Sequence, residues 1–549
     1  MATYANPVDL PYRYQTPVKI PQIQLKLGEA YREAADPTII TYKGLYYLFA
    51  SHSKGYWHSP DLQHWTFVEA SGYAVDKFAP TVVVIRGRMY LATSESTRRI
   101  WTTDDPKSGR WYEAAVIEQR YEDPDMFLDD DGRLYMYSGL ASKGPLRVDE
   151  LDTTTFRVIR TAQISQSRDK DGRGWEVPGD NNEKPGAPSF VEGSWMTKHD
   201  GRYYLEYSAP GTEFKTYANG VLVADNPMGP FVYQDYSPFA VKPTGFITGA
   251  GHGNTFKDEA GRWWHAGTMT ISQRHIFERR LGLFPARFTR TGEVLSDTYL
   301  GDYPRYFSGN RDLTGWMLLS RGRTATASST LDGFPVENAV DEESRTSWSA
   351  RSGGDEWFQI DLGAKKRVDA IQINFADQGS QGRGISRDSY RYVLELSDDG
   401  QRWRTAIDHA HDGRDAPHDY QVLPRAQRAR FVRLRNMHAP DGGNFSLYDL
   451  RVFGKGAGRR PGRVGAVQAI RSVKDPRRVT INWQAAPGAE FHIVRLGRRP
   501  DLMNQNFQVY DGVTSLEIGS LNLSKRYCVA IDAVNENGIA RSKNVRCFD

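Results

Sequence analysis

The stretch Gly132-Arg133-Leu134-Tyr135-Met136, a glycine in a polar turn followed by an aromatic-rich strand, occurs in five versions in the first half of the chain. The other versions are Gly44-Leu45-Tyr46-Tyr47-Leu48, Gly87-Arg88-Met89-Tyr90-Leu91, Gly201-Arg202-Tyr203-Tyr204-Leu205 and Gly261-Arg262-Trp263-Trp264-His265. Repeats about 40 to 70 residues apart, each a polar turn between two short apolar strands, are typical of the blades of a β-propeller.

Each version follows a candidate site residue at a nearly constant distance. Seven to nine residues before the glycines stand Asp36, Pro80, Asp123, Glu192 and His252. If equivalent positions of the blades meet at one end of a central channel, two aspartates, one glutamate and one histidine share a pocket. This convergence is the main functional prediction from the repeats.

The composition excludes several classes of protein. The 71 Lys and Arg and 67 Asp and Glu are spread along the 549 residues with a net charge of +4. No basic stripe is present, so we expect no nucleic-acid partner. No apolar run reaches the roughly 18 residues of a membrane span. Aromatic residues make up 12% of the chain, which both β-strands and sugar-binding surfaces favour.

The compartment is predicted from the N-terminus and the two cysteines. Met1-Ala2-Thr3-Tyr4-Ala5 has neither the charged nor the apolar region of a signal peptide, so the protein is either cytosolic or a mature form with an added start Met. Cys528 and Cys547 flank Asn537-Gly538, a favoured hairpin turn that would place them opposite each other, close enough to bridge. Two buried free thiols are the alternative. Because a disulfide favours an oxidising compartment, we expect a secreted or periplasmic protein.

The chain divides into three regions, all of them β. Residues 1–310 hold the repeats and a long polar insertion from Arg168 to Pro188, of the kind that is usually functional or mobile. Residues 318–455 and 463–549 follow, separated by a Gly/Arg/Pro linker at 454–462. No amphipathic helix is expected anywhere.

The second region contains Glu337-Asn338-Ala339-Val340-Asp341, then a stretch from Trp357 to Gly363, and later Ser397-Asp398-Asp399-Gly400. Their order and spacing closely resemble the discoidin (factor 5/8 type C) domain. The resemblance implies an eight-stranded jelly roll, with Trp348 and Trp357 at core positions. Whether this domain binds a glycan or buttresses the propeller is left open.

The third region is similar to a fibronectin type III sandwich. Val479-Thr480-Ile481-Asn482-Trp483 forms one strand, and Tyr527 begins another near the usual place of a tyrosine corner. A spacer or a docking surface is its expected role, because fold alone indicates no activity.

Three carboxyl groups at matched repeat positions indicate hydrolysis of a glycosidic bond. Two carboxyls can cleave such a bond, one protonating the leaving oxygen and the other activating water. A third carboxylate nearby raises the pKa of the acid by like-charge repulsion. Asp36, Asp123 and Glu192 meet this requirement, and each stands in an apolar strand context. The alternative for any one of them is a solvated turn residue.

The same residues carry a family resemblance. Ala35-Asp36-Pro37, Phe78-Ala79-Pro80, Asp123-Pro124-Asp125-Met126-Phe127, Val191-Glu192-Gly193-Ser194-Trp195 and Gly251-His252-Gly253 match glycoside hydrolase family 43 in order. A late arginine, Arg279 or Arg280, continues the match. The resemblance implies a five-bladed propeller that hydrolyses with inversion.

By this resemblance Asp36 is the general base, Glu192 the general acid, and Asp123 tunes the pKa of the acid and orients the sugar. His252 either packs beneath the sugar, holds a structural Ca²⁺ through water, or is a structural histidine. No cofactor is required. We predict that Phe78, Trp195, His252 and Arg280 bind substrate, although Ser194-Trp195 departs from the Gly-Pro-His of many relatives.

Other acidic residues are weaker candidates. Asp125 could replace Asp123, since period 2 places both on one strand face, but the Asp-Pro pattern favours Asp123. Glu206 and Glu213 are expected at the surface. Asp129–Asp131 lacks the other ligands of an EF-hand and is predicted to be a hairpin turn.

The sequence therefore predicts an exo-acting, inverting glycoside hydrolase that releases terminal furanosyl residues from a polysaccharide or oligosaccharide, with α-L-arabinofuranoside as the preferred substrate. β-D-Galactofuranosidase, β-xylosidase and β-galactosidase activities are the alternatives within the family. A non-catalytic carbohydrate-binding protein is the alternative of another class.

Overall fold

The computed structural model describes residues 2–15, 30–73, 77–94, 98–140, 144–271, 274–307 and 312–549. In these residues the helices are four single 3-10 turns: η1 (Pro106–Ser108), η2 (Gly174–Glu176), η3 (Val336–Ala339) and η4 (Pro440–Gly442). Nearly all other regular structure is β-strand, so the predicted all-β fold is confirmed. Within the same ranges, no helix combines the length and the apolar character needed to cross a membrane.

The first region contains five four-stranded antiparallel sheets, here called blades one to five. Blade one is β4 (Thr38–Tyr42), β5 (Leu45–Phe49), β6 (Gly55–Ser59) and β7 (Thr66–Glu69). Blade two is β8 (Phe78–Ile85), β9 (Arg88–Ser94), β10 (Arg99–Thr103) and β11 (Tyr112–Val116). Blade three is β12 (Asp125–Leu128), β13 (Leu134–Ser138), β14 (Leu146–Leu151) and β15 (Val158–Ile164). Blade four is β16 (Glu192–His199), β17 (Arg202–Ala209), β18 (Ala218–Ala224) and β19 (Val232–Tyr233). Blade five is β20 (Thr248–Lys257), β21 (Trp263–Thr270), β22 (Arg279–Phe288) and β23 (Val294–Ser296).

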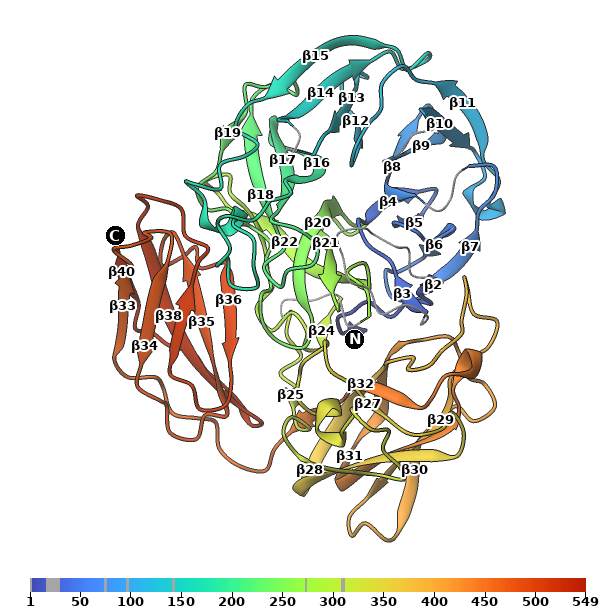
Figure 1. Ribbon diagram of the computed structural model, residues 1–549, viewed down its shortest axis with the longest axis vertical. Helices are drawn as coiled ribbons and strands as arrows, with labels where there is room; N and C mark the ends of the chain where they lie inside the picture. Colours follow the sequence, from blue (N-terminus) through green and yellow to red (C-terminus); the bar gives the residue numbers. More distant parts are fainter. Residues whose placement is uncertain are drawn as a thin grey trace.

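The blades form a ring around a central axis, as Figure 1 shows. The first strands β4, β8, β12, β16 and β20 lie nearest this axis and contact one another in turn. The aromatic-rich repeats are the second strands, and their side chains fill the spaces between blades. Tyr47 and Phe49, for example, pack with Met89 and Leu91 of the next blade. Both faces of these second strands are largely buried, which explains why the repeats are aromatic at successive positions.

The N-terminal segment runs across blade five and ends beside blade one. It contains β1 (Thr3–Tyr4), which pairs with β24 (Arg305–Tyr306), and β2 (Arg13–Gln15), which pairs with β3 (Tyr31–Glu33). The buried Asn6 fixes it, because its amide donates to the carbonyls of Leu283 and Gly301.

The second region is a single eight-stranded network. Its strands are β25 (Met317–Leu318), β26 (Thr324–Ala327), β27 (Trp348–Ser349), β28 (Glu356–Phe375), β29 (Arg391–Ser397), β30 (Trp403–Asp408), β31 (His418–His438) and β32 (Ser446–Lys455). Trp348 is fully buried in its core, as the resemblance implies, whereas Trp357 is only half-buried.

The third region is a sandwich of two sheets. One sheet is β33 (Val467–Arg471), β34 (Val479–Trp483) and β37 (Ser515–Ile518). The other is β36 (Gln505–Val509), β35 (Phe491–Gly497), β38 (Tyr527–Asn535), β39 (Gly538–Ala540) and β40 (Arg546–Phe548). The Tyr527 hydroxyl accepts a hydrogen bond from the amide of Asn522 (2.9 Å), as in a tyrosine corner. The likeness to fibronectin type III stays a prediction, as do the three domain boundaries, although no named strand pairs across them.

The disulfide between Cys528 and Cys547 is present, in a different hairpin register from the predicted one. Asn535 pairs with Gly538, so Glu536 and Asn537 form the turn instead of Asn537-Gly538. The register then shifts before β40, where Cys528 faces Cys547. The turn lies one residue earlier than predicted, which would displace the pairing by two residues, and the two-residue register shift before β40 restores the opposition of the two cysteines.

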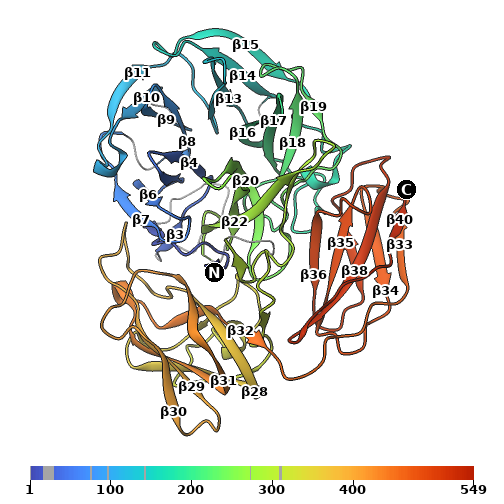
Figure 2. The ribbon, with the colours of Figure 1, turned by 180° about the vertical axis from the view of Figure 1, so that it is seen from behind.

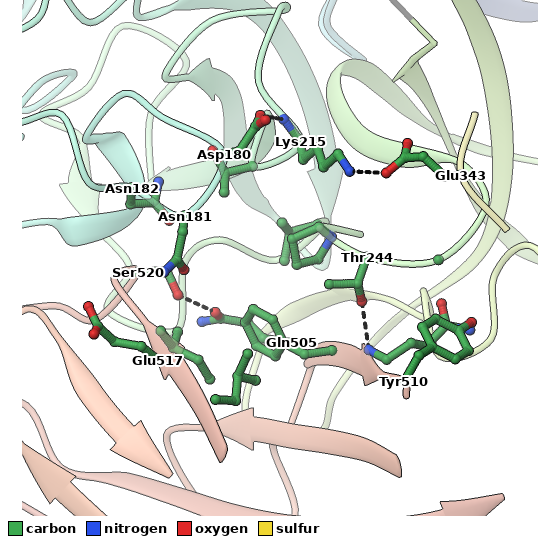
Figure 3. Close-up of a pocket in the computed structure, with 18 of the residues that line it drawn as sticks. Asp180, Asn181, Asn182, Lys215, Thr244, Glu343, Gln505, Tyr510, Glu517 and Ser520 are labelled. Atoms are coloured by element: carbon green, nitrogen blue, oxygen red, sulfur yellow. Dashed lines mark hydrogen bonds and ion pairs between the residues drawn. The ribbon is translucent and has the colours of Figure 1, made fainter. Parts of the chain in front are cut away.

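Both sandwiches lie against the propeller, as the two opposite views show (Figures 1 and 2). The insertion from Arg168 to Pro188 contacts the third region, since Gly174 donates to the carbonyl of Leu521 (2.8 Å). The second and third regions also contact each other through an ion pair between Arg323 and Glu536 (2.7 Å). A cavity of about 520 Å³ lies where all three regions meet (Figure 3).

Candidate active site

A residue with left-handed backbone geometry stands in, or two residues before, the inner strand of every blade, at the matched repeat position. These residues are Asp36 (φ 52°), Ala79 (φ 45°), Asp123 (φ 46°), Gly193 (φ 65°) and His252 (φ 36°). Non-glycine residues seldom adopt this conformation, and such strain clusters at functional sites. The pairing register also shifts beside three of them, in β8, β16 and β20. The predicted positions Pro80 and Glu192 thus each lie one residue away from the left-handed residue of their blade, Ala79 or Gly193.

At these left-handed positions the blades place most of the candidate residues around one cavity of about 490 Å³. It is lined by Asp36, Phe78, Ser94, Asp123, Phe190, Glu192, Gly211, Thr212, Glu213, His252, Ile276, Phe277 and Arg279. Five of the seven predicted catalytic and substrate-binding residues are in this set. Trp195 and Arg280 are not. The cavity shares no lining residue with the one at the junction of the three regions.

Asp36 is surrounded by donors. Ser51 Oγ donates to its Oδ2 (2.6 Å), and Arg279 Nη1 and His252 Nδ1 each lie 3.2 Å from its Oδ1. Burial alone would raise the pKa of Asp36, but Arg279, His252 and the Ser51 hydroxyl together outweigh it and hold the pKa below its usual value. Asp36 is therefore ionised at neutral pH.

Glu192 has the opposite electrostatic environment. Burial and the nearby charge of Asp123 raise its pKa to about 8, and the hydrogen bond from the Tyr217 hydroxyl (2.8 Å) only partly offsets them. Glu192 is therefore mostly protonated at neutral pH. Two carboxyl groups of one cavity thus hold different protonation states, the condition for acid and base roles.

Asp123 and His252 line the same cavity as these two groups. His252 Nδ1 is 3.6 Å from Asp123 Oδ2. Burial raises the pKa of Asp123, His252 counteracts this, and Asp36 adds to it. The close approach of His252 requires Gly193, where a Cβ would lie only 2.8 Å from His252 Cγ. A glycine next to Glu192 is thus a steric requirement of the site.

The prediction that Arg280 binds substrate is wrong. Neighbouring residues of β22 face opposite sides, and Arg280 lies on the side away from the cavity. Arg279 points into the cavity and also pairs with Glu33 (2.6 Å), whose pKa burial raises to about 7. Arg280 is fully buried on the other side, where it donates to His418 Nε2 (2.8 Å) of the second region.

Trp195 also lies outside the cavity. Its indole donates to the carbonyl of Thr255 on β20 (3.0 Å), so the ring covers the neighbouring strand instead of a sugar. Asp125 is buried below the site and accepts the amide of Met196 (2.6 Å), and burial raises its pKa to about 8. The choice of Asp123 over Asp125 for the pocket agrees with this placement.

Glu206 is not at the surface. It is buried beside His265, with 3.7 Å between its Oε2 and His265 Nδ1, and burial raises its pKa to about 8. Glu213 does line the cavity, and burial raises its pKa as well. Asp129–Asp131 forms the predicted turn between β12 and β13.

Four apolar residues form much of the pocket wall: Phe78, Phe190, Ile276 and Phe277. Only Phe78 was predicted to bind substrate. The rings of Phe78 and Phe277 lie 5.4 Å apart. The other three stand in connections between strands, where no repeat identifies them. For the stretch Phe277–Arg280, the resemblance to the family was the sole indication in the sequence that it lies at the site.

A structural Ca²⁺ stays a prediction. Among the described residues, no group of three or more His, Cys, Asp or Glu is arranged to hold a metal ion. His252 Nδ1 is directed at two carboxylates instead. We therefore derive no step through a metal.

The comparisons with known proteins define the class. Residues 31–292 match the family model of glycosyl hydrolases family 43, and residues 324–450 match the F5/8 type C domain. The propeller is therefore a glycoside hydrolase domain of family 43, an inverting family, and the second region is an F5/8 type C domain. Both resemblances read from the motifs are confirmed.

Individual relatives are more distant. The chain is 34% identical over 154 residues to a beta-xylosidase of Xylanibacter ruminicola, which covers 24% of this chain and 46% of that protein. It is 25% identical over 259 residues to a xylosidase/arabinosidase of Bacteroides ovatus, covering 36% and 76%. A crystal structure of an endo-1,4-beta-xylanase from Bacteroides thetaiotaomicron has 23% identity and a TM-score of 0.41, covering 49% of this chain and 95% of that one. The chain thus spans about half the length of the first of these relatives.

Proposed function

We propose that this protein is an exo-acting, inverting glycoside hydrolase that releases terminal α-L-arabinofuranosyl residues from a polysaccharide or oligosaccharide. The observation that carries the proposal is the pair of carboxyls, Asp36 and Glu192, with opposite pKa shifts in one cavity. A cavity of about 490 Å³ suits one terminal sugar with part of its neighbour.

In the proposed reaction Asp36 takes a proton from water as the water oxygen bonds to the anomeric carbon. The glycosidic C–O bond breaks on the opposite face, and Glu192 gives its proton to the leaving oxygen. Arg279 and His252 keep Asp36 ionised. Burial and the charge of Asp123 keep Glu192 protonated, and Asp123 orients the sugar. The rings of Phe78 and Phe277 provide apolar surface for the C–H face of the sugar.

β-Xylosidase activity is the second candidate, because one relative is named a beta-xylosidase and another a xylosidase/arabinosidase. β-D-Galactofuranosidase and β-galactosidase activities stay open, without a specific observation in their favour. A panel of aryl arabinofuranoside, xyloside and galactofuranoside substrates separates these. We expect the arabinofuranoside to have the highest kcat/KM.

The disulfide supports the proposal that the protein works in an oxidising compartment, secreted or periplasmic. The proposed partner is the polysaccharide itself, and a glycan bound by the F5/8 type C domain would be an additional one.

The decisive experiment replaces the two carboxyls. Asp36→Ala and Glu192→Gln should each lower turnover by about 10²–10⁴-fold, the usual contribution of a general acid or base. Glu192→Gln should lose less on a dinitrophenyl glycoside, whose leaving group needs no proton. Proton NMR of the first-formed anomer should show inversion.

Asp125→Asn is the matched control, since it changes a buried carboxyl outside the cavity. Near-full activity of Asp36→Ala would refute its role as base. Tight glycan binding by a wild-type protein without turnover would favour the non-catalytic alternative.

A further inference from the structure

Three wall segments of the catalytic cavity are fixed from outside, each by residues of the F5/8 type C domain. The first is the segment 274–279, where Ile276 and Phe277 face the cavity. The residue that follows them, Glu278, is fully buried and turned the other way. The Tyr448 hydroxyl from β32 donates to Glu278 Oε1 (2.5 Å). Arg274 donates to the same oxygen (3.1 Å).

Tyr448 lies in a core shared by the two domains. It packs with Phe246, Ile247, Met269 and Phe284 of the propeller, and no part of its side chain is exposed. The guanidinium of Arg274 also donates to the carbonyl of Ala376 in the F5/8 type C domain. The segment that carries Phe277 is thus fastened by a side chain and a backbone group of the second domain.

The second wall segment holds Thr212 and Glu213. Arg345 of the F5/8 type C domain donates to the carbonyl of Glu213 (3.0 Å) and pairs with Asp180 of the insertion (2.6 Å). Lys215 forms an ion pair with Glu343 of the same domain (Figure 3). These contacts are partly exposed and individually weak, but together they join the segment of Thr212 and Glu213 to the F5/8 type C domain.

The third wall segment is β3 (Tyr31–Glu33), which shortly precedes Asp36 in the chain. Arg32 is fully buried and forms ion pairs with Asp377 (2.8 Å) and Asp415 (2.7 Å) of the F5/8 type C domain. The next residue along β3, Glu33, faces the other side and holds Arg279, which in turn contacts Asp36. Neighbouring residues of one strand therefore connect the second domain to the catalytic carboxylate.

We propose that the F5/8 type C domain positions the walls of the catalytic pocket, with Tyr448 as a positioning residue that acts on substrate binding through Phe277. The inference rests on the proposed function of the pocket. It assigns the second domain a part in catalysis that requires no glycan to be bound to it. Phe277 forms a wall and does not exchange protons, so its displacement weakens substrate binding more than the chemical step.

The test is Tyr448→Phe in the full-length protein, which keeps the ring in the shared core and removes one hydroxyl. We expect KM for an aryl arabinofuranoside to rise about tenfold, the upper size expected for one buried hydrogen bond, while kcat stays within about twofold. Glu278→Gln, which alters the propeller side of the same contact, should shift KM in the same direction.

Phe277→Ala completes a double-mutant cycle. If Tyr448 acts through Phe277, the double variant has the KM of Phe277→Ala alone, because the wall is already lost. Multiplied effects would overturn the proposal, and so would an unchanged KM in Tyr448→Phe.

Hydrogen exchange provides a readout that needs no activity. The amide of Glu278 donates to the carbonyl of His275 (2.8 Å), and its exchange should accelerate in Tyr448→Phe while exchange in blades two and three stays unchanged. Unchanged exchange at this segment would overturn the proposal. A wild-type protein that hydrolyses no substrate in the panel would refute the proposed function instead.

The matched control is Tyr299→Phe. The Tyr299 hydroxyl donates to Asp532 (2.9 Å) at the interface with the third region, so the variant removes a buried tyrosine–carboxylate bond of the same kind. It should lower the melting temperature as much as Tyr448→Phe and leave KM unchanged. An equal rise of KM in both variants would show a general loss of stability and contradict a specific role of Tyr448.

Discussion

Asp36 and Glu192 differ in charge at neutral pH because burial raises the pKa of both, but Asp36 also faces an arginine and a histidine whereas Glu192 faces a carboxylate. A base must be ionised and an acid protonated for turnover. We therefore expect kcat/KM to fall at low pH only below about 4, since the pKa of Asp36 lies below its ordinary value of 3.8. On the alkaline side kcat/KM should fall as Glu192 loses its proton near pH 8.

Asp123→Asn tests the origin of the alkaline limb. Removing this negative charge lowers the pKa of Glu192, so the limb should move to lower pH, with kcat/KM reduced about tenfold or more at the optimum. The measurement is the pH profile of kcat/KM on an aryl glycoside. Asp125→Asn should leave the profile unchanged, because burial already keeps Asp125 largely neutral at pH 7. A shift to higher pH in Asp123→Asn would contradict the assignment.

Strand β22 directs two adjacent arginines to opposite sides, Arg279 into the cavity and Arg280 toward the second region. Substitutions of the two arginines should therefore have different effects. Arg279→Gln removes the cation beside Asp36, so the pKa of Asp36 rises and the acid limb of kcat/KM should move to higher pH. Glu33, left without its partner, can take up a proton because its pKa is already about 7. Turnover should fall about 10²-fold.

Arg280→Gln is the matched change on the opposite face. It should lower the melting temperature, since it leaves His418 and the carbonyl of Arg32 without their donor, but it should not move the acid limb. If both variants shift the limb equally, the division of β22 into a catalytic and a structural face is wrong.

The alternation of side chains along strands also explains which parts of the site could be predicted from the sequence. The repeats predict the second strand of each blade because an aromatic pattern reports burial on both faces. The position of the three acidic residues followed, since each stands at a fixed distance from those strands. The choice between Arg279 and Arg280 did not follow, because a shift of one residue reverses the face of a strand. A register shift in β16 likewise removes Trp195 from the site.

The pocket residues that lie in loops could not be predicted from the sequence either. Phe190, Ile276 and Glu213 line the pocket from irregular segments whose course depends on contacts with distant parts of the chain. The contact between Arg345 and the Glu213 carbonyl joins residues 132 positions apart. No local pattern encodes such a pairing, so the walls of the site required the structure whereas its acidic centre did not.

The whole molecule is held together by buried contacts between its three regions. Arg32, Arg280 and Tyr14 of the first region are buried against the second. Tyr299 and Asp532 join the first region to the third. We expect the full chain to unfold in one cooperative calorimetric transition, because regions with large buried interfaces do not unfold independently.

Truncation should reveal the same coupling. A chain ending at residue 307 loses Asp377 and Asp415, the partners of Arg32, and exposes to water the apolar side chains of Phe246, Ile247 and Phe284 that pack against the second region. We expect this variant to be poorly soluble and inactive. A chain ending at residue 462 loses only the third region and should stay folded with a lower melting temperature. A soluble, fully active propeller from the shorter chain would contradict the coupling.

The ion pair between Arg32 and Asp377 also bears on how such enzymes diversify. Accessory domains are often treated as interchangeable parts that recombination can swap between unrelated catalysts. Here a transplanted domain would have to bring its own counterparts of Asp377, Tyr448 and Arg345, or the recipient would inherit a misshapen pocket. Catalyst and accessory domain are therefore expected to have been inherited together, as a single unit of descent.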